Sequence, residues 1–200
     1  MRKISSLLVV LAMVILLVPA GASALMLSFD PVSQEVPVGA SVDVALTLLG
    51  LGDGIAPSLS TFDLDILFNP AILTFDSVTF GDPILGDQLD VFGLGLNPTF
   101  AGLMSPGVLN VFELSLDLQS DLDFFQADSF TLATLTFDTL VIGTSFLNIS
   151  INALGDALGD SLYADVTNGS ISAVPEPSTL LLLGSGLLGI PWFRKKWGKV

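Results

Sequence analysis

Apolar and polar side chains alternate every two residues through much of the middle of the chain. In the segment 41–48, four apolar side chains share one face: Val42, Val44, Leu46 and Leu48. Successive side chains of a strand point to opposite faces, so this pattern predicts a half-buried strand. The same alternation predicts strands over 62–68, 112–119 and 147–151, with Phe112 and Leu114 on the apolar face and Glu113 on the polar face.

Further β-rich runs at 73–80 and 132–140 end in turn formers such as Gly81 and Gly143. No comparable helical stripe occurs between Leu25 and Ala173, and short strands without alternating helices predict an all-β antiparallel jelly-roll sandwich. Thirteen of the fourteen phenylalanines lie in this region, mostly at alternating positions, and we expect them in the core. The segment 94–110 is expected to be a long loop or to contain a weak edge strand.

Residues 1–24 have the three parts of a secretory signal peptide. Arg2 and Lys3 precede twelve apolar residues, and the small residues Ala22 and Ala24 frame a cleavage site after Ala24. The alternative is a retained anchor. Twelve helical residues would span only ~18 Å of a hydrocarbon core about 30 Å thick, which favours removal.

The last residues, 174–200, contain a second apolar segment, which is flanked by a proline motif and a basic cluster. Pro175, Glu176 and Pro177 precede the apolar run 180–193, which the basic residues follow: Arg194, Lys195 and Lys196. The positive-inside rule keeps this basic cluster cytoplasmic, with the domain outside. Fourteen residues span only ~21 Å as a helix, which is short for a permanent anchor. A segment that is recognised and processed fits better than a plain short anchor.

This order of elements resembles the PEP-CTERM sorting signal of Gram-negative bacteria. In that family a membrane-embedded exosortase cuts near the Pro-Glu-Pro motif, here Pro175 to Pro177, and the proteins are linked to surfaces rich in exopolysaccharide. The resemblance implies an exosortase-type partner, an inner-membrane intermediate held by the C-terminal helix, and a final place at the cell surface or in the extracellular matrix.

The charges are strongly segregated. All six basic residues lie near the two ends, and the stretch 25–173 carries nineteen of the twenty acids and no Lys or Arg, so its formal charge is −19. Such a domain is not expected to bind nucleic acid or a bare anionic membrane by simple electrostatics. Acidic loops that keep an exported protein soluble are one interpretation, and divalent-cation binding is the other.

The residue inventory argues against catalysis. The chain has no Cys and no His, and the domain has no Lys, which excludes thiol nucleophiles, histidine triads and Ser-Lys dyads. Asp76 and Asp138 each follow a Phe, superficially as in aspartic proteases, but the glycine of that motif is missing. A glycosidase needs two carboxylates that flank one bond, and no spacing among these acids singles out such a pair. We therefore expect no enzyme and no catalytic residue.

Calcium and carbohydrate remain as ligands to weigh. Candidate oxygen ligands for calcium occur in three groups: Asp63 and Asp65; Asp121 and Asp123; Asp156, Asp160, Asp165 and Asn168. None has the order of an EF-hand loop. Sugar binding usually relies on exposed Trp or Tyr, and the domain offers only Tyr163.

The segments 36–44, 62–73 and 75–81, followed by 130–137, 143–148 and 168–172, resemble the successive strands of a cohesin domain. The resemblance covers nearly all of residues 25–173. It implies a nine-stranded jelly roll related to carbohydrate-binding modules. Cohesins of cellulosomes bind dockerins, and cohesin-like domains on single surface proteins often have no known dockerin partner.

The sequence thus predicts a signal peptide at 1–24, one cohesin-like domain at 25–173 and a sorting tail at 174–200. The function expected is a non-enzymatic adhesion or scaffold module at the surface of a Gram-negative bacterium, binding an unidentified surface protein or polysaccharide. The alternative is a carbohydrate-binding component of an extracellular polysaccharide matrix, assisted by calcium.

Overall fold

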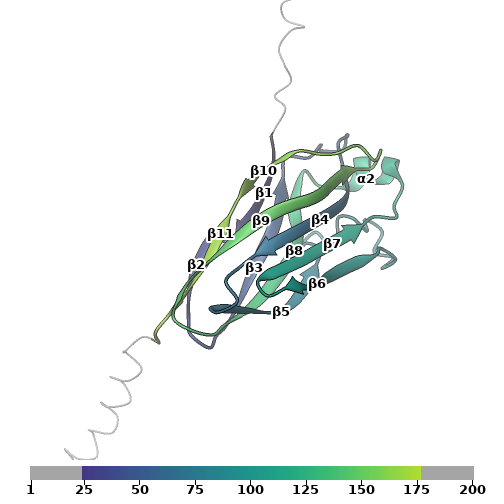
Figure 1. Ribbon diagram of the computed structural model, residues 1–200. Coiled ribbons are helices and arrows are strands. Elements are labelled where there is room, and N and C mark those ends of the chain that lie inside the picture. Colours follow the sequence, from purple (N-terminus) through teal and green to yellow (C-terminus); the bar gives the residue numbers. More distant parts are fainter. Residues whose placement is uncertain (1–23, 177–200) are drawn as a thin grey trace, which may run out of the picture.

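The computed structural model describes residues 24–176, which form two β-sheets packed face to face (Figure 1). Sheet A has five strands in the order β10-β1-β3-β8-β5, and sheet B has six in the order β2-β11-β9-β4-β7-β6. The expected all-β sandwich is confirmed. One helix occurs among the described residues, α2 (Gln119–Phe125), in a region where no helical stripe was predicted.

The strands of sheet A are β1 (Leu25–Asp30), β3 (Ser41–Leu49), β5 (Leu73–Phe80), β8 (Ser129–Thr139) and β10 (Ala164–Thr167). The strands of sheet B are β2 (Ser33–Pro37), β4 (Leu59–Leu67), β6 (Thr99–Ser105), β7 (Val108–Leu114), β9 (Gly143–Asp156) and β11 (Gly169–Val174). The segment 94–110 does contain an edge strand, β6.

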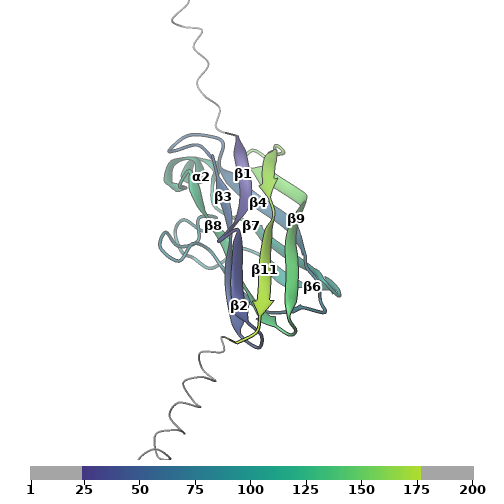
Figure 2. The ribbon, with the colours of Figure 1, turned by 90° about the vertical axis from the view of Figure 1, so that its left-hand side faces the viewer.

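The first and last strands of the domain run side by side and parallel. β1 pairs with β10 in sheet A, the chain then crosses, and β2 pairs with β11 in sheet B (Figure 2). β1–β2 and β10–β11 are thus two runs, each interrupted where it changes sheets. Counted as runs, the eleven strands become the nine that the resemblance to cohesins implies.

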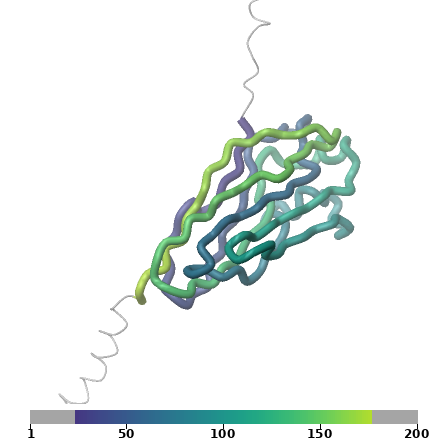
Figure 3. The backbone as a smooth tube through the Cα atoms, viewed as in Figure 1, coloured from purple at the N-terminus to yellow at the C-terminus, as the bar shows by residue number. Residues whose placement is uncertain are grey.

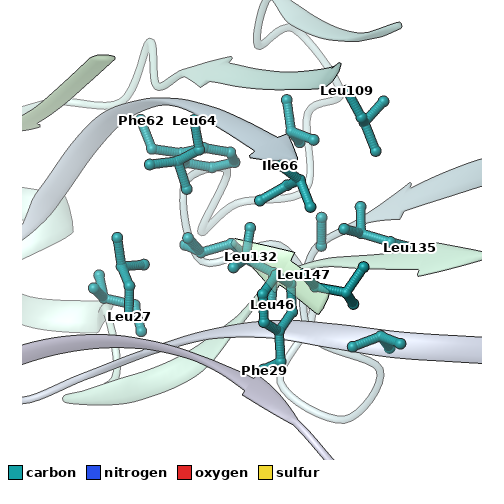
Figure 4. Packing of buried hydrophobic residues seen from close by; sticks show 14 of the residues in the cluster. Leu27, Phe29, Leu46, Phe62, Leu64, Ile66, Leu109, Leu132, Leu135 and Leu147 are labelled. Carbon is teal, nitrogen blue, oxygen red and sulfur yellow. The ribbon is translucent and has the colours of Figure 1, made fainter. Parts of the chain in front are cut away.

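The core lies between the sheets and is built from the inward positions of both (Figure 4). On β3 the four predicted positions, Val42 to Leu48, are buried, and on β4 Phe62, Leu64 and Ile66 are fully buried. Phe137 contributes aromatic contacts, with ring centroids 5.2 Å from Phe68 and 6.1 Å from Phe75. With no disulfide in the chain, this apolar packing carries the stability of the sandwich.

Two expectations about apolar residues were wrong. The strand predicted at 112–119 is instead β7, which ends at Leu114, and its inward positions are Leu109, Val111 and Glu113, so the two faces are reversed. Five of the thirteen phenylalanines are exposed rather than in the core: Phe92, Phe100, Phe124, Phe125 and Phe146.

The sandwich has two distinct ends (Figure 3). The segments 50–58, 81–98, 115–128 and 157–163 connect strands at the end that carries α2, which we call the helical end. The turns 38–40, 68–72, 106–107 and 140–142 connect strands at the opposite end, where β11 also finishes, which we call the tail end. Gly107 has a φ of +82°, and a Cβ there would lie 2.6 Å from the Phe68 carbonyl oxygen, so this turn requires glycine.

Replacing Phe137 by Ala is expected to lower the free energy of unfolding by about 3–5 kcal/mol, because the substitution leaves a cavity between both sheets. Phe146→Ala is the matched control, since its ring is 66% exposed, and it should change stability by less than about 0.5 kcal/mol. Urea denaturation of residues 25–176 measures both. Equal losses would show that the assignment of the core is wrong.

Candidate functional site

The helical end exposes a cluster of aromatic side chains. Phe92 comes from the segment 81–98, and Phe124 and Phe125 come from α2, with exposed fractions of 54%, 68% and 54%. The rings of Phe92 and Phe125 are 5.8 Å apart, those of Phe124 and Phe125 are 4.9 Å apart, and both pairs are close to edge-to-face. We call these three residues the aromatic cluster. Clustered exposed aromatic side chains are typical of binding surfaces.

Two buried glutamines fix the segments that carry the cluster. Gln126 directly follows α2, its Nε2 donates to the carbonyls of Leu59 (2.9 Å) and Gln88 (2.8 Å), and its Oε1 accepts from Leu59 N (2.6 Å). The Oε1 of Gln88 accepts from Ala127 N at 2.9 Å. Because both amide groups are satisfied in the protein interior, they tie α2, the segment 81–98 and β4 together as one unit.

Carboxylates at this end shape the loops around the cluster. Asp82 accepts hydrogen bonds from the backbone N–H groups of Ile84 (2.8 Å), Leu85 (2.9 Å) and Thr131 (3.0 Å). Burial opposes its ionisation, but these bonds together outweigh burial and lower the pKa of Asp82. Asp90 accepts from Leu94 N and Gly95 N in the same way. Asp82 and Asp90 therefore hold the backbone of these loops in place through hydrogen bonds.

Glu113 lies in the core position at the end of β7 and is fully buried. Its Oε1 accepts from Asn97 Nδ2 at 3.1 Å, whereas its Oε2 has no hydrogen-bond partner among the described residues. Burial raises the pKa of Glu113 to about 8; the Asn97 bond opposes this shift, and the nearby carboxylates of Asp87 and Asp90 add to it. Glu113 therefore holds a proton at neutral pH.

Four of the acids predicted as calcium ligands, Asp63, Asp65, Asp123 and Asp156, are engaged by neutral partners. Asn110 Nδ2 donates to Asp63 (2.6 Å) and Asp65 (2.9 Å), and Ser58 donates to Asp123 (2.6 Å). Asp156 accepts from the backbone N–H groups of the turn that follows it. Within residues 24–176, no three acidic side chains come together as a metal site. The acids of the two Phe-Asp pairs are likewise bonded, Asp138 to Ser41 and Asp76 to Ser77.

The outer face of sheet A carries a hollow of about 390 Å³. Ser28, Thr47 and Thr131 lie across from one another on β1, β3 and β8, and all three line it, together with Asp30 and Asp82. A row of hydroxyl and carboxylate groups of this kind suits a polyhydroxylated ligand. Tyr163, the residue predicted as a sugar platform, is 90% exposed on the segment 157–163 at the helical end.

The predicted sorting and cleavage residues lie at the borders of the described chain. Ala24 is exposed before β1, and Pro175 and Glu176 are exposed after β11. Outside the described residues lie Ala22, Pro177, Arg194, Lys195 and Lys196. Within residues 24–176, no helix has the length and apolar character needed to cross a membrane.

Sequence reasoning missed Glu113 and the aromatic cluster. Reading the alternation from Leu109 through Val111 would have placed Glu113 inward. Phe124 and Phe125 follow Leu122, the buried residue of α2, by two and three residues. This spacing could have indicated a short helix with one buried and one exposed face.

Comparison with known proteins identifies the tail and the fold. Residues 173–196 match the model of the PEP-CTERM protein-sorting motif. No curated protein sequence matches the chain.

The domain has the fold of cohesins. The sixth cohesin of scaffoldin B from Acetivibrio cellulolyticus, solved in complex with a Cel5 dockerin, is 23% identical with a TM-score of 0.61, and the match covers 76% of this chain and all of that one. A non-cellulosomal cohesin from Archaeoglobus fulgidus is 15% identical (TM-score 0.56; 78% and 96% covered). A cohesin module from a family 33 glycoside hydrolase of Clostridium perfringens is 13% identical (TM-score 0.57; 77% and 99% covered).

The buried acid makes stability depend on pH. Below pH about 4.5 Glu113 is neutral in both the folded and the unfolded chain, whereas between about 4.5 and 8 only the unfolded chain loses the proton. Stability from this residue therefore falls as pH rises through that window, by at most about 1.4 kcal/mol per pH unit, and levels off above it. Glu113→Gln mimics the protonated acid and should remove this fall, making the variant more stable than the wild type at pH 9.

Urea denaturation at pH 5, 7 and 9 measures the difference. The exposed Glu35→Gln is the matched control, because it removes one charge without touching the core. If Glu113→Gln is less stable than the wild type at all three values, the proton is not held by Glu113.

Proposed function

We propose that this chain is a non-enzymatic cell-surface protein that displays its cohesin-fold domain as an adhesion or scaffold module. Residues 1–24 direct export, residues 25–173 form the binding module, and residues 174–200 sort the protein. The cohesin fold supports the role of the module, and the PEP-CTERM motif supports the sorting of the protein. The absence of His and Cys from the whole chain supports a role without catalysis.

The observation that carries the binding role is the aromatic cluster. Three exposed rings on a rigid base can enter a partner's apolar pocket at little cost in conformational entropy. The acids around them, Asp87 and Asp121 among others, would attract a partner with basic residues beside that pocket. The relatives support a protein as partner, because the Acetivibrio cohesin was solved with a dockerin.

The tail gives the route to the surface. We propose that an exosortase-type enzyme recognises Pro175, Glu176 and Pro177 while the apolar run 180–193 holds the protein in the inner membrane. Arg194, Lys195 and Lys196 keep the end of the chain on the cytoplasmic side. After processing, the domain remains at the cell surface or in the extracellular matrix of a Gram-negative bacterium.

A second candidate is glycan binding in that matrix. The hydroxyl row of Ser28, Thr47 and Thr131 in the hollow of sheet A favours it, since carbohydrate sites need several convergent polar groups. In the calcium-assisted form of this function, calcium would have to replace the neutral hydrogen-bond donors that Asp63, Asp65 and Asp123 now have.

Phe124→Ser is expected to weaken binding to the protein partner by about tenfold or more, because it removes the most exposed ring of the cluster. Phe146→Ser is the matched control: its ring is similarly exposed, 66% against 68%, but lies on the outer face of sheet B. Immobilised residues 25–176 first retain the partner from the producing cell's secreted proteins. Titration with the purified partner then gives both affinities.

The immobilised domain and its variants are also tested for binding to the cell's matrix polysaccharide, once with calcium and once with a chelator. Polysaccharide binding that Thr47→Val abolishes and Phe124→Ser leaves intact would favour the second candidate and contradict the first. Loss of that binding in chelator would make it calcium-assisted.

Processing of the tail predicts a specific mass. Protein extracted from the cell surface should lack residues 178–200 as well as 1–24, whereas a variant with Pro175→Ala and Pro177→Ala should keep the tail and remain in the inner membrane. Intact-mass spectrometry of both fractions measures this. A surface-extracted wild type that keeps residues 178–200 would leave only a plain short anchor.

A further inference from the structure

The two ends of the sandwich differ in charge. The segments of the helical end contain nine carboxylates: Asp53, Asp82, Asp87, Asp90, Asp117, Asp121, Asp123, Asp128 and Asp160. The four turns of the tail end contain no charged residue. In a domain with nineteen acids and no cation, four turns without charge at one end need a physical reason.

The turn between β8 and β9 is also unusual in composition. It consists of Leu140, Val141 and Ile142, which are 47%, 50% and 65% exposed. Turns normally carry Gly, Asn, Asp or Ser at such positions. Leu103 and Met104, at the end of β6, are 50% and 65% exposed, so the apolar surface extends beyond one turn.

A hollow of about 400 Å³ continues this surface. Leu140 and Leu103 line it together with Phe68, Pro70 and Gly107, and no charged residue contributes to its lining. Backbone hydrogen bonds hold the turns around it in place, from Phe68 N to Gly107 O (2.9 Å) and from Leu140 N to Ile72 O (2.7 Å). The surface is therefore a preformed apolar patch and does not come from loose loops.

The chain leaves the domain beside one part of this patch, because Ala173 of β11 pairs with Gly143, which follows the turn 140–142. β11 ends at Val174, whose carbonyl accepts from Val38 N in the turn 38–40 at 2.9 Å. Only residues 175–179 separate Val174 from the apolar run that begins at Leu180. Fully extended, this linker reaches at most about 20 Å. Whatever holds the run 180–193 therefore lies next to the tail end.

We propose that the tail end of the domain rests on the lipid surface of the membrane that holds its tail, with Leu140, Val141 and Ile142 inserted among the headgroups. This rests on the proposed function, in which the run 180–193 is inserted before processing. Aliphatic tips without charge suit this interface, and the nine carboxylates of the helical end are kept farthest from anionic lipids. A weak contact suffices, because the short linker holds the patch at high effective concentration.

The orientation also serves the binding role. A domain that stands on its tail end points the aromatic cluster away from the membrane, where a partner can reach it. The inserted precursor would thus already present its binding surface outward.

The absence of cysteine makes a direct test clean. Residues 25–200 are reconstituted into vesicles of phosphatidylethanolamine and phosphatidylglycerol, with a single cysteine introduced as Val141→Cys or, as the matched control at the helical end, Leu158→Cys. Leu158 is 65% exposed, and neither substitution touches the core. An environment-sensitive fluorophore on each cysteine is then exposed to lipids that carry a nitroxide quencher. We expect severalfold stronger quenching and a blue shift at position 141 only.

Flotation with the vesicles separates the two claims. If the chain does not float, the tail does not act as a membrane segment, and the proposed sorting route and this inference both fall. If it floats but the labels at 141 and 158 are quenched equally, only the inference fails. If the fluorophore at position 141 is shielded from water only at a high ratio of protein to lipid, a second copy of the chain covers the patch. That result would also overturn the inference.

Discussion

The parallel pairing of the first and last strands is the constraint on which the rest of the structure depends. β1–β2 and β10–β11 cross together from one sheet to the other, with Leu25 opposite Ala164 at the start and Pro37 opposite Val174 at the finish. Because the two runs are parallel, the domain begins at the helical end, and its last strand finishes at the opposite end. The sorting tail therefore leaves from the end that lies farthest from α2 (Figure 1). Removing either run would take the edge strand from one sheet and an inner strand from the other.

That polarity is matched by chemistry. At the helical end, acids accept hydrogen bonds from loop backbone, and two buried glutamines join the segments. Burial raises the pKa of Glu113, which lies beside Asp87 and Asp90, so that it remains protonated. The resulting surface combines fixed aromatic rings with negative charge. At the tail end the turns are apolar and uncharged. The chain thus leaves the domain at one pole and exposes the aromatic cluster at the other, which fits the proposed display of a binding surface away from the tail.

The sequence predicted the sandwich because alternation on β3 and β4 is clear: the predicted inward positions, Val42 to Leu48 on β3 and Phe62 to Ile66 on β4, taken every second residue, are all buried. It failed where apolar residues occupy both faces. In the segment 108–119, Val111 and Phe112 are adjacent, so either register satisfies the pattern, and only pairing with β4 decides which face is buried. The aromatic cluster was missed for a similar reason. Phe124 and Phe125 look like core residues, and their exposure depends on how α2 packs through Leu122 and Gln126, which local pattern does not encode.

The central claim is that this cohesin-fold module binds through its helical end. Hydrogen–deuterium exchange of residues 25–176, with and without the secreted material of the producing cell, tests it most directly because every loop reports at once. The account predicts that protection appears in the segments 81–98 and 115–128 and leaves the turns of the tail end unchanged. Protection that is confined to the outer face of either sheet, with no change in those two segments, would contradict it.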